Sequence, residues 1–231
     1  MLNKIKEIFS GSNILRFRSL ININMIRNIF LFTGGIIIFI FGVILYGIIL
    51  NLREPTLAQA MREKGFTSFE NPNIIIDRKS YSLNLYEDSV LVKSYRANFG
   101  KNVASAKSKK NDSATPVGQY SICDMIGSHK YHKFLKINYP NLQDAAEALR
   151  RNIISQEEFN ELQFEYYYEG CPSLETALGG NIGIHGIGEY NDIFKNLPFV
   201  YNWTDGSIAV SNESIDEIFS VVKKGTRVVI K

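Results

Sequence analysis

The sequence has almost no excess of charge of either sign. Among its 231 residues, 26 are lysine or arginine and 23 are aspartate or glutamate, a formal net charge of +3. Proteins that bind nucleic acid through a basic face carry a much larger positive excess, so we expect no nucleic-acid partner. Apolar residues make up 45% of the chain and charged residues 21%, which excludes a disordered tail or a collagen-like fibre.

Cysteine and histidine are also scarce. Two cysteines, Cys123 and Cys171, are too few for a disulfide scaffold, although they can form one bond in an oxidising compartment. The sequence does not show whether they meet. His129 and His132 have the spacing of a metal-binding pair, but no third ligand follows at a convincing distance. We therefore predict two exposed loop histidines and no metal site.

One long apolar run lies near the N-terminal end. From Ile29 to Leu50 the chain has 22 residues without a charge. A helix of that length rises roughly 33 Å, which matches a hydrocarbon core of about 30 Å. A buried helix of a soluble protein is seldom apolar on every face over such a length. We therefore predict that residues 28–50 cross the inner (cytoplasmic) membrane as a single span.

The basic residues of this region all precede the apolar run. Residues 1–51 carry five basic residues and one acidic residue, a net charge of +4, so the rest of the chain carries −1. By the positive-inside rule, the chain before the span stays in the cytoplasm and the chain after it is exported. We expect a cytoplasmic basic tail (1–27), a signal anchor (28–50), a linker (51–71) and a domain in the periplasm or outside the cell (72–231).

A cleaved signal peptide is the alternative to an anchor. Ala58-Gln59-Ala60 has the small-x-small form of a cleavage site. The apolar run is longer than the usual signal-peptide core of about 7–15 residues, and the alanine pair lies well beyond its end. These two features favour the anchor.

The exported part has the patterns of short strands. The predicted strands are residues 73–77, 81–86, 90–95, 115–122, 179–186 and 227–230. The second and third alternate between apolar and polar residues around Glu87-Asp88-Ser89, which predicts a hairpin. The lysine- and serine-rich residues 101–114 are expected to form a mobile loop.

Helical patterns interrupt these strands. One begins at Leu142, a second follows the capping box Ser155-Gln-Glu-Glu158, and a third follows Ser211-Asn-Glu-Ser214 and ends before Gly225. The predicted fold class is α+β, mainly β with helical insertions.

Two glycine-framed segments have the residues needed for acyl transfer. Ile184-His185-Gly186 places a histidine at the end of a strand, and Trp203-Thr204-Asp205-Gly206-Ser207 places a hydroxyl just after a glycine. A histidine within reach of a nucleophilic side chain, with backbone amides free to face an oxyanion, is the minimum apparatus for this chemistry. On composition alone, a structural histidine and a turn serine explain the same pattern.

Together with Thr115-Pro-Val-Gly118, these segments make the exported part similar to the L,D-transpeptidase (YkuD-type) catalytic domain, in its murein L,D-transpeptidase branch. The resemblance runs from about Asn73 to Lys231 and implies a sandwich- or barrel-like β fold. It also implies attack on the peptide carbonyl of a peptidoglycan stem, with His185 as the base and no metal or organic cofactor. The resemblance further implies that Gly186 and Gly206 help to hold the oxyanion.

The family's nucleophile is a cysteine, and the matching position in this sequence is Ser207. A serine hydroxyl needs a well-oriented base because it is far less acidic than a thiol. Three hypotheses remain open: Ser207 is a working nucleophile, the domain is a catalytically degenerate wall-binding or regulatory module, or Cys171 has moved into the site. Asp205, Asp192 and Glu189 are candidate carboxylate partners of His185.

The resemblance and the apolar run together predict a membrane-anchored, exported acyltransferase acting on peptidoglycan stem peptides. Thr204, Asp205 and Trp203 are the predicted substrate-binding residues. The sequence does not show whether the acceptor is a second stem, a lipoprotein lysine or water.

Overall fold

The structure of the chain, a computed structural model, describes residues 23–52, 54–172, 176–197 and 201–231. The chain divides into two compact units, residues 1–50 and residues 51–231. Most of the predicted basic tail lies outside the described residues.

Among its described residues, the first unit consists of helix α3 (Ile23–Leu52), which ends just after the boundary between the two units. Its residues Ile23–Leu50 have a mean hydropathy of 2.6, and the helix is long and apolar enough to cross a membrane. Large side chains such as those of Phe32 and Phe39 are exposed along it. The same length and composition are found in signal sequences near an N-terminus, so the helix is a candidate span.

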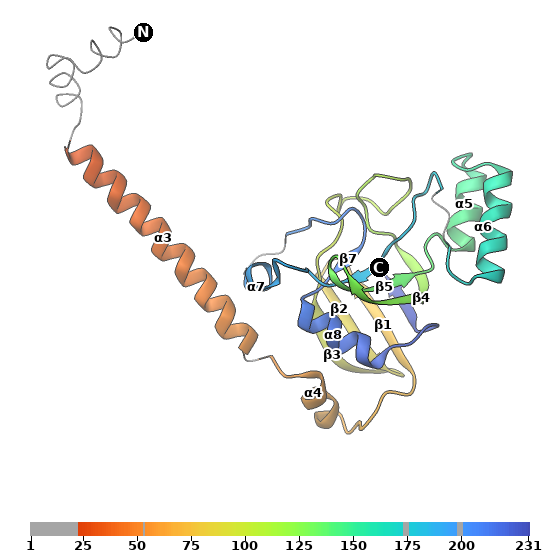
Figure 1. Cartoon of the computed structure of the whole chain (residues 1–231), viewed down its shortest axis with the longest axis horizontal. Coiled ribbons are helices and arrows are strands. Elements are labelled where there is room, and N and C mark those ends of the chain that lie inside the picture. Colours follow the sequence, from red (N-terminus) through yellow and green to blue (C-terminus); the bar gives the residue numbers. More distant parts are fainter. Residues whose placement is uncertain (1–22, 53, 173–175, 198–200) are drawn as a thin grey trace, which may run out of the picture. The chain divides into compact units, whose positions relative to one another are not determined.

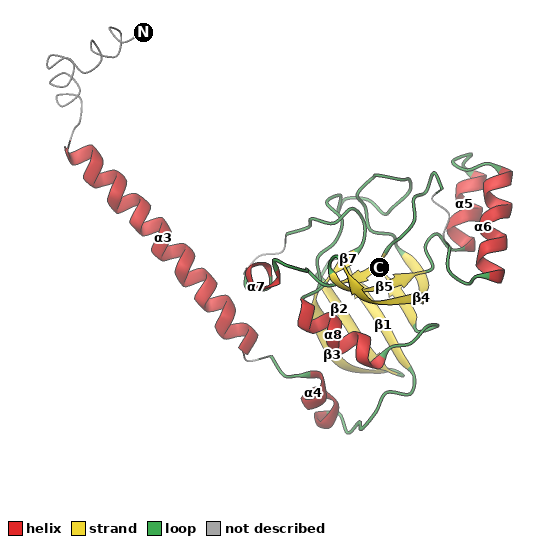
Figure 2. Ribbon diagram, viewed as in Figure 1, coloured by secondary structure: helices red, strands yellow, loops and turns green. Residues whose placement is uncertain are grey.

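The second unit is a mixed α+β domain (Figures 1 and 2). Its strands are β1 (Pro72–Asp77), β2 (Ser82–Glu87), β3 (Val90–Arg96), β4 (Gly118–His129), β5 (His132–Ile137), β6 (Gly183–His185), β7 (Ile208–Ala209) and β8 (Arg227–Ile230). Its helices are α4 (Leu57–Glu63), α5 (Leu142–Arg150), α6 (Gln156–Tyr168), α7 (Asn191–Phe194) and α8 (Asn212–Val221). The predicted α+β class is confirmed: one sheet is combined with several helices.

The strands form one sheet in the order β3-β2-β1-β8-β4-β5-β6-β7. Just beyond β3, the N–H of Asn98 donates to the carbonyl of Ala209 in β7 at 2.8 Å, and the N–H of Ala209 donates back at 2.9 Å. This bridge joins the two ends of the strand order. The sheet therefore closes on itself, as the barrel-like expectation requires.

The first strands follow the alternating pattern of the sequence. In β1 the side chains of Ile74 and Ile76 are fully buried, and in the antiparallel β2 those of Leu83 and Leu85 are. Successive side chains on a strand point to opposite faces, so every second residue enters the core. Asp88 takes a positive φ of 51° in the tight turn to β3, which confirms the predicted hairpin.

Helices α5 and α6 form a hairpin at one end of the domain (Figure 1). The predicted capping box of α6 is confirmed: the N–H of Glu158 donates to Ser155 Oγ at 3.1 Å, and the N–H of Ser155 donates to the Glu158 carboxylate at 3.0 Å. The hairpin has its own small core, separate from the main one. That core consists of Ala145, Ala148, Ile154, Leu162 and Leu178.

Helix α4 belongs to the domain core, although we expected residues 51–71 to be a linker. Leu57 and Ala60 are each only 5% exposed and lie in the main hydrophobic cluster. The N–H of Leu57 donates to Glu217 in α8 at 2.8 Å, and the same carboxylate pairs with Lys93 of β3 at 2.6 Å. The linker prediction for these residues is therefore wrong where α4 packs into the core.

Residues 101–114, expected to be a mobile loop, have a defined fold around Asp112. Its carboxylate accepts hydrogen bonds from the N–H groups of Ser108, Lys109 and Ala114. It also pairs with Lys107 Nζ at 2.9 Å, and both of these side chains are more than nine-tenths buried. One internal carboxylate thus organises the lysine-rich segment.

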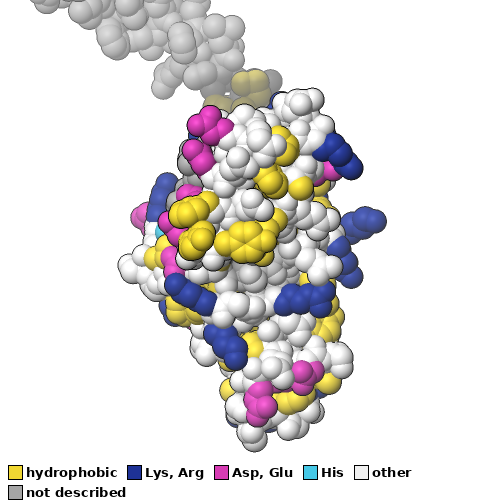
Figure 3. Space-filling model, turned by 90° about the vertical axis from the view of Figure 1, so that its right-hand side faces the viewer, with side chains coloured by type: hydrophobic (Ala, Val, Ile, Leu, Met, Phe, Trp, Pro, Cys, Tyr) yellow, Lys and Arg dark blue, Asp and Glu magenta, His cyan; other side chains and the backbone are white. Residues whose placement is uncertain are grey.

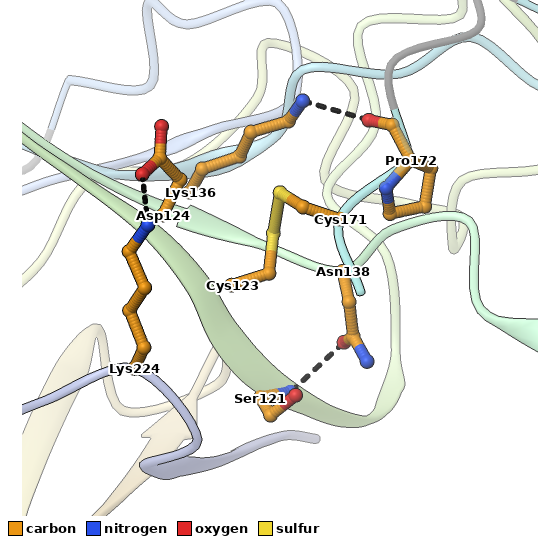
Figure 4. The surroundings of a disulfide bond; sticks show 8 residues. All are labelled: Ser121, Cys123, Asp124, Lys136, Asn138, Cys171, Pro172 and Lys224. Carbon is orange, nitrogen blue, oxygen red and sulfur yellow. Dashed lines mark hydrogen bonds and ion pairs between the residues drawn. A yellow bond between two sulfur atoms is a disulfide. The ribbon is translucent and has the colours of Figure 1, made fainter. Parts of the chain in front are cut away.

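Cys123 and Cys171 form a disulfide bond across 48 residues (Figure 4). It ties β4 to the segment after α6, where Lys136 Nζ also donates to the carbonyl of Pro172 at 2.7 Å. The pairing that the sequence left open is therefore present. Cys171 is excluded as a nucleophile, because its sulfur is bonded to Cys123.

Candidate active site

His185 and Ser207 are brought together by two short parallel strands. Strand β6 pairs with β7 so that Ile184 lies opposite Ile208 and His185 opposite Ala209. One step before β7, the N–H of Gly183 donates to Ser207 Oγ at 3.3 Å. In this register Gly183 lies opposite Ser207. Side chains two residues apart on a strand share a face, so His185, two residues after Gly183, faces the same side of the sheet as Ser207.

That side opens into a cavity of about 300 Å³, which both residues line. Trp203, Thr204 and Asp205 also line it. The cavity lies next to β7. At this strand the Asn98–Ala209 bridge closes the sheet by joining β7 to the segment after β3. The two segments singled out in the sequence, together with all three predicted substrate-binding residues, therefore converge on one cavity.

The hydrogen bond of His185 fixes which ring nitrogen carries the proton. Nδ1 lies 2.6 Å from the carbonyl oxygen of Gly186, and a carbonyl can only accept. Nδ1 therefore donates, and in the neutral ring Nε2 keeps its lone pair. The imidazole is 3% exposed, and burial lowers the pKa of His185 to about 4. At neutral pH the ring is an uncharged base.

Aromatic rings enclose this imidazole. Tyr131 stacks on it with centroids 4.8 Å apart and planes 26° apart, and Phe134 lies parallel at 6.3 Å. Trp203 meets it edge-on at 5.6 Å. These contacts exclude water from the ring and restrict its rotation. The exclusion of water lowers the pKa of His185, because the charged form of the ring loses its hydration.

The turn before Ser207 is held by Thr204. Its side chain is buried, donates to the Ser207 carbonyl at 2.6 Å and accepts the N–H of Gly206 at 3.3 Å. Gly206 has a φ of +131°, and a Cβ there would lie 2.7 Å from the carbonyl oxygen of Ala114. Only glycine fits this conformation and this space, so Gly206 sets the position of Ser207.

Gly186 is needed for close packing. A Cβ at this residue would lie 2.5 Å from Asn212 Oδ1 and 2.8 Å from the Tyr131 carbonyl. Its N–H donates to the Lys133 carbonyl at 3.3 Å, as that of Gly206 donates to Thr204. The N–H groups of Gly186 and Gly206, which we expected to hold an oxyanion, thus both donate to acceptors within the protein.

Two of the three candidate carboxylate partners of His185 have other partners, and the third, Glu189, is exposed. Asp205 is exposed and pairs with Lys101 at 2.9 Å, and Asp192 pairs with Lys195 at 2.9 Å. The hydrogen bond with Lys101 lowers the pKa of Asp205. The acceptor for Nδ1 of His185 is instead the neighbouring carbonyl, which no side-chain pattern in the sequence could reveal.

The other two histidines flank the turn between β4 and β5. His129 Nδ1 accepts the N–H of Tyr131 at 3.2 Å, and His132 Nε2 pairs with Asp216 at 2.9 Å. Both side chains are half-buried rather than exposed. Within the described residues, no group of three or more potential metal ligands comes together.

Part of the cavity wall was not predicted from the sequence. Lys107, Lys110 and Asn111 line it from the segment that we expected to be mobile, and Tyr131 lines it from the β4–β5 turn. The lysine-rich composition of this segment predicted a mobile loop and gave no indication of the buried ion pair of Lys107. The glycine pair Gly179-Gly180, which also lines the cavity, was the available signal for backbone close to a ligand.

A family model described as the L,D-transpeptidase catalytic domain (YkuD) matches residues 71–230. The chain belongs to the L,D-transpeptidase catalytic domain family. The match contains the His185 and Ser207 segments and the disulfide. A search of curated proteins gives no significant match.

The solved structures that resemble the chain do so only distantly. One from Xylanimonas cellulosilytica is 16% identical with a TM-score of 0.40, over 77% of this chain and 70% of its own. One from Enterococcus faecium is 15% identical with a TM-score of 0.39, over 71% and 50%. The helical cell shape determining protein Pgp2 from Campylobacter jejuni is 16% identical with a TM-score of 0.44, over 76% and 55%. The chain thus spans about half the length of the last two.

Proposed function

We propose that the chain is a membrane-anchored, exported acyltransferase of the L,D-transpeptidase family that acts on peptidoglycan stem peptides through Ser207. The observation that carries the proposal is the shared cavity of Ser207 and His185, with the imidazole proton held on Nδ1. Nε2 is then the base, and the carbonyl of Gly186 keeps the ring in that tautomer.

The chemistry follows from these two groups. Ser207 Oγ attacks the carbonyl carbon of the stem peptide while its proton passes to Nε2 of His185. The C–N bond breaks, the proton leaves with the amine, and an ester remains on Ser207. An amine or water then attacks this ester by the reverse proton path. For Gly186 or Gly206 to stabilise the oxyanion, its N–H would exchange its present acceptor for the substrate oxygen.

The experiment uses the full chain in detergent micelles with disaccharide-tetrapeptide monomers. We expect cross-linked dimers or shortened stems from the wild type and from Ser207→Cys, and at least a hundredfold less from Ser207→Ala and His185→Gln. Ser220→Ala, at an exposed hydroxyl on α8, is the matched control and should retain activity. If both the wild type and Ser207→Cys give no product, the enzyme proposal is wrong.

A non-catalytic wall-binding or regulatory module is the second candidate. Ser207 Oγ already accepts the Gly183 N–H, and both candidate oxyanion amides have protein acceptors, a geometry that also suits binding without chemistry. This candidate predicts equal retention of wild type and Ser207→Ala on purified sacculi, with no change in the muropeptides. Failure of both proteins to bind sacculi would eliminate it.

A further inference from the structure

Among the described residues of the domain, exposed aromatic side chains form two groups. One group lies on α6 and consists of Phe164, Tyr167 and Tyr168. Figure 3 shows hydrophobic side chains among charged ones on the side of the domain that carries α5 and α6 in Figure 1. The other group lies around α7 and consists of Tyr190 and Tyr201. Single exposed apolar residues are common, whereas a cluster of them indicates a surface that contacts a partner.

The group around α7 is one continuous patch. The ring of Phe194 is half-buried and lies between those of Tyr190 and Tyr201, with its centroid 6.4 Å from each. Ile193, on the same short helix, is 61% exposed. We name these four residues the α7 patch.

Polar side chains hold α7 against the domain. Asn191 is buried, and its amide donates to the carboxylate of Glu213 in α8 at 3.1 Å and accepts the N–H of Asn212 at 2.8 Å. Lys195 Nζ pairs with the same carboxylate at 2.6 Å. The polar side chains of α7 are thus used for attachment, and the apolar ones remain available for a partner.

The α7 patch lies near the point where the chain enters the domain. Arg96, at the end of β3, donates to the carbonyl of Leu197, three residues beyond Phe194. Burial lowers the pKa of Arg96, and the negative charge of nearby Glu54 opposes that shift. In Figure 1, α7 and α4 lie on the side of the domain away from α5 and α6. One arginine therefore connects the patch segment to the first residues of the domain.

The distance from this entry point to a bilayer is limited by the chain itself. Glu54 is only four residues beyond Leu50, where the apolar candidate span ends. Four residues extend at most about 14 Å. The headgroup layer on each side of the hydrocarbon core is about 5–8 Å thick. If α3 crosses the membrane, the part of the domain around Glu54 and Arg96 is held at the membrane surface.

We propose that the α7 patch rests on the phospholipid surface of the membrane that α3 crosses. This inference rests on the membrane anchor of the proposed function, not on the chemistry of Ser207. Tyrosine is enriched at membrane surfaces because its ring enters the apolar layer while its hydroxyl stays in water. Trp203, two residues beyond Tyr201, lines the active-site cavity, so the contact holds that cavity near the bilayer.

The charges beside the patch predict a contact that does not require anionic lipids. Glu189 and Asp192 are exposed acids, and Lys195 pairs with Asp192 at 2.9 Å. A surface that binds anionic lipids carries an excess of lysine or arginine, which this segment lacks. The apolar and aromatic side chains therefore supply the attraction.

The test measures contact with lipid in the full chain, reconstituted into phosphatidylcholine vesicles. The acyl chains are either unmodified or brominated near the headgroup, because bromine quenches tryptophan fluorescence on contact. Trp203 is the only native tryptophan, so fluorescence in excess of the wild type reports the introduced residue. Ile193→Trp places the reporter in the α7 patch, and Phe164→Trp, at a similarly exposed position on α6, is the matched control.

We expect bromine to quench about half or more of the fluorescence added by Ile193→Trp, because interfacial side chains reach about 5–10 Å into the boundary of the acyl chains. The fluorescence added by Phe164→Trp should be unchanged by bromine and should remain accessible to acrylamide in the water. Replacing part of the lipid with brominated phosphatidylglycerol should leave the quenching of Ile193→Trp unchanged.

The proposal is overturned if the retained chain shows no quenching of Ile193→Trp, if Phe164→Trp is quenched equally, or if quenching requires the anionic lipid. A carbonate wash of the same vesicles tests the anchor separately, and release of the chain would eliminate the anchor and this inference together. Absence of enzymatic product from both the wild type and Ser207→Cys would eliminate the acyltransferase proposal and leave this contact intact.

Discussion

At the scale of single residues, the protonation state of His185 is the property on which the proposed chemistry depends. Its ring is enclosed by Tyr131, Phe134 and Trp203, and its Nδ1 is bonded to a carbonyl. A buried imidazole resists protonation because its charged form loses hydration. The site therefore gains a base that stays neutral well below pH 6, although a base of low pKa drives proton transfer less strongly.

The first prediction concerns the pH dependence of kcat/KM. With the pKa of His185 at about 4, activity should rise as pH increases through about 4 and be level by neutral pH, because only the unprotonated ring accepts the serine proton. Tyr131→Leu exposes one face of the ring, so the acidic limb should move toward the ordinary histidine pKa of about 6.5. A wild-type limb already near pH 6.5 would contradict the buried, neutral base.

The second prediction concerns the backbone at Gly206. Gly206→Ala should destabilise the domain by about 1–3 kcal/mol and abolish activity, because the added methyl meets the Ala114 carbonyl at a φ that L-residues rarely adopt. Gly127→Ala is the control, since a Cβ there meets nothing within 4 Å, and it should change stability by less than about 0.5 kcal/mol. Urea unfolding and product analysis measure both. Wild-type activity in Gly206→Ala would show that this backbone does not position Ser207.

At the scale of secondary-structure elements, α4 and the α5–α6 hairpin extend the sheet domain in different ways. Helix α4 contributes two side chains to the main core and a backbone donor to Glu217. The hairpin has a separate small core, and the disulfide holds its exit segment to β4. Helix α4 thus stabilises the main core, whereas the hairpin is stabilised by a core of its own.

The third prediction tests whether α4 is part of the domain. Leu57→Ala should lower the free energy of unfolding by about 2–5 kcal/mol, the usual cost of emptying a buried leucine site. Arg62→Ala, on the exposed face of the same helix, should cost less than about 0.5 kcal/mol. Denaturant unfolding of the full chain, followed by near-ultraviolet circular dichroism, compares them. Equal midpoints for the two variants would mean that α4 does not stabilise the domain.

At the scale of the whole molecule, the proposed location outside the cytoplasm draws support from two independent features. Helix α3 is long and apolar enough to span a bilayer, and the domain contains a disulfide, which persists mainly in oxidising compartments. Cleavage after Ala60 would divide α4 and remove Leu57 from the core. The packing of α4 therefore favours an uncleaved anchor over a signal peptide.

The fourth prediction concerns this anchor. The full chain should remain in the membrane pellet after a carbonate wash, whereas a chain beginning at residue 54 should be released, because only the first contains the apolar helix. Protease added from the periplasmic side should digest the domain of the full chain. A mature protein whose first residue is Met61 would contradict the anchor.

Features set by neighbouring residues could be predicted from the sequence. The long apolar helix, the β2–β3 hairpin and the capping box at Ser155 each depend on residues within one or two turns. The order of the T-P-V-G, His185-Gly and Gly-Ser207 segments was sufficient to identify the family. The convergence of His185 and Ser207 was an inference from that order alone.

Only the tertiary structure decided the features that depend on residues distant in the chain. These include the bond between Cys123 and Cys171, the burial of Leu57, the closure through Asn98 and Ala209, and the buried ion pair of Lys107 in the wall of the active-site cavity. A local pattern records whether a side chain is apolar or charged, but not which partner desolvates it or accepts its proton. The sequence alone therefore determined the candidate groups, and packing determined their protonation, their burial and the space around them.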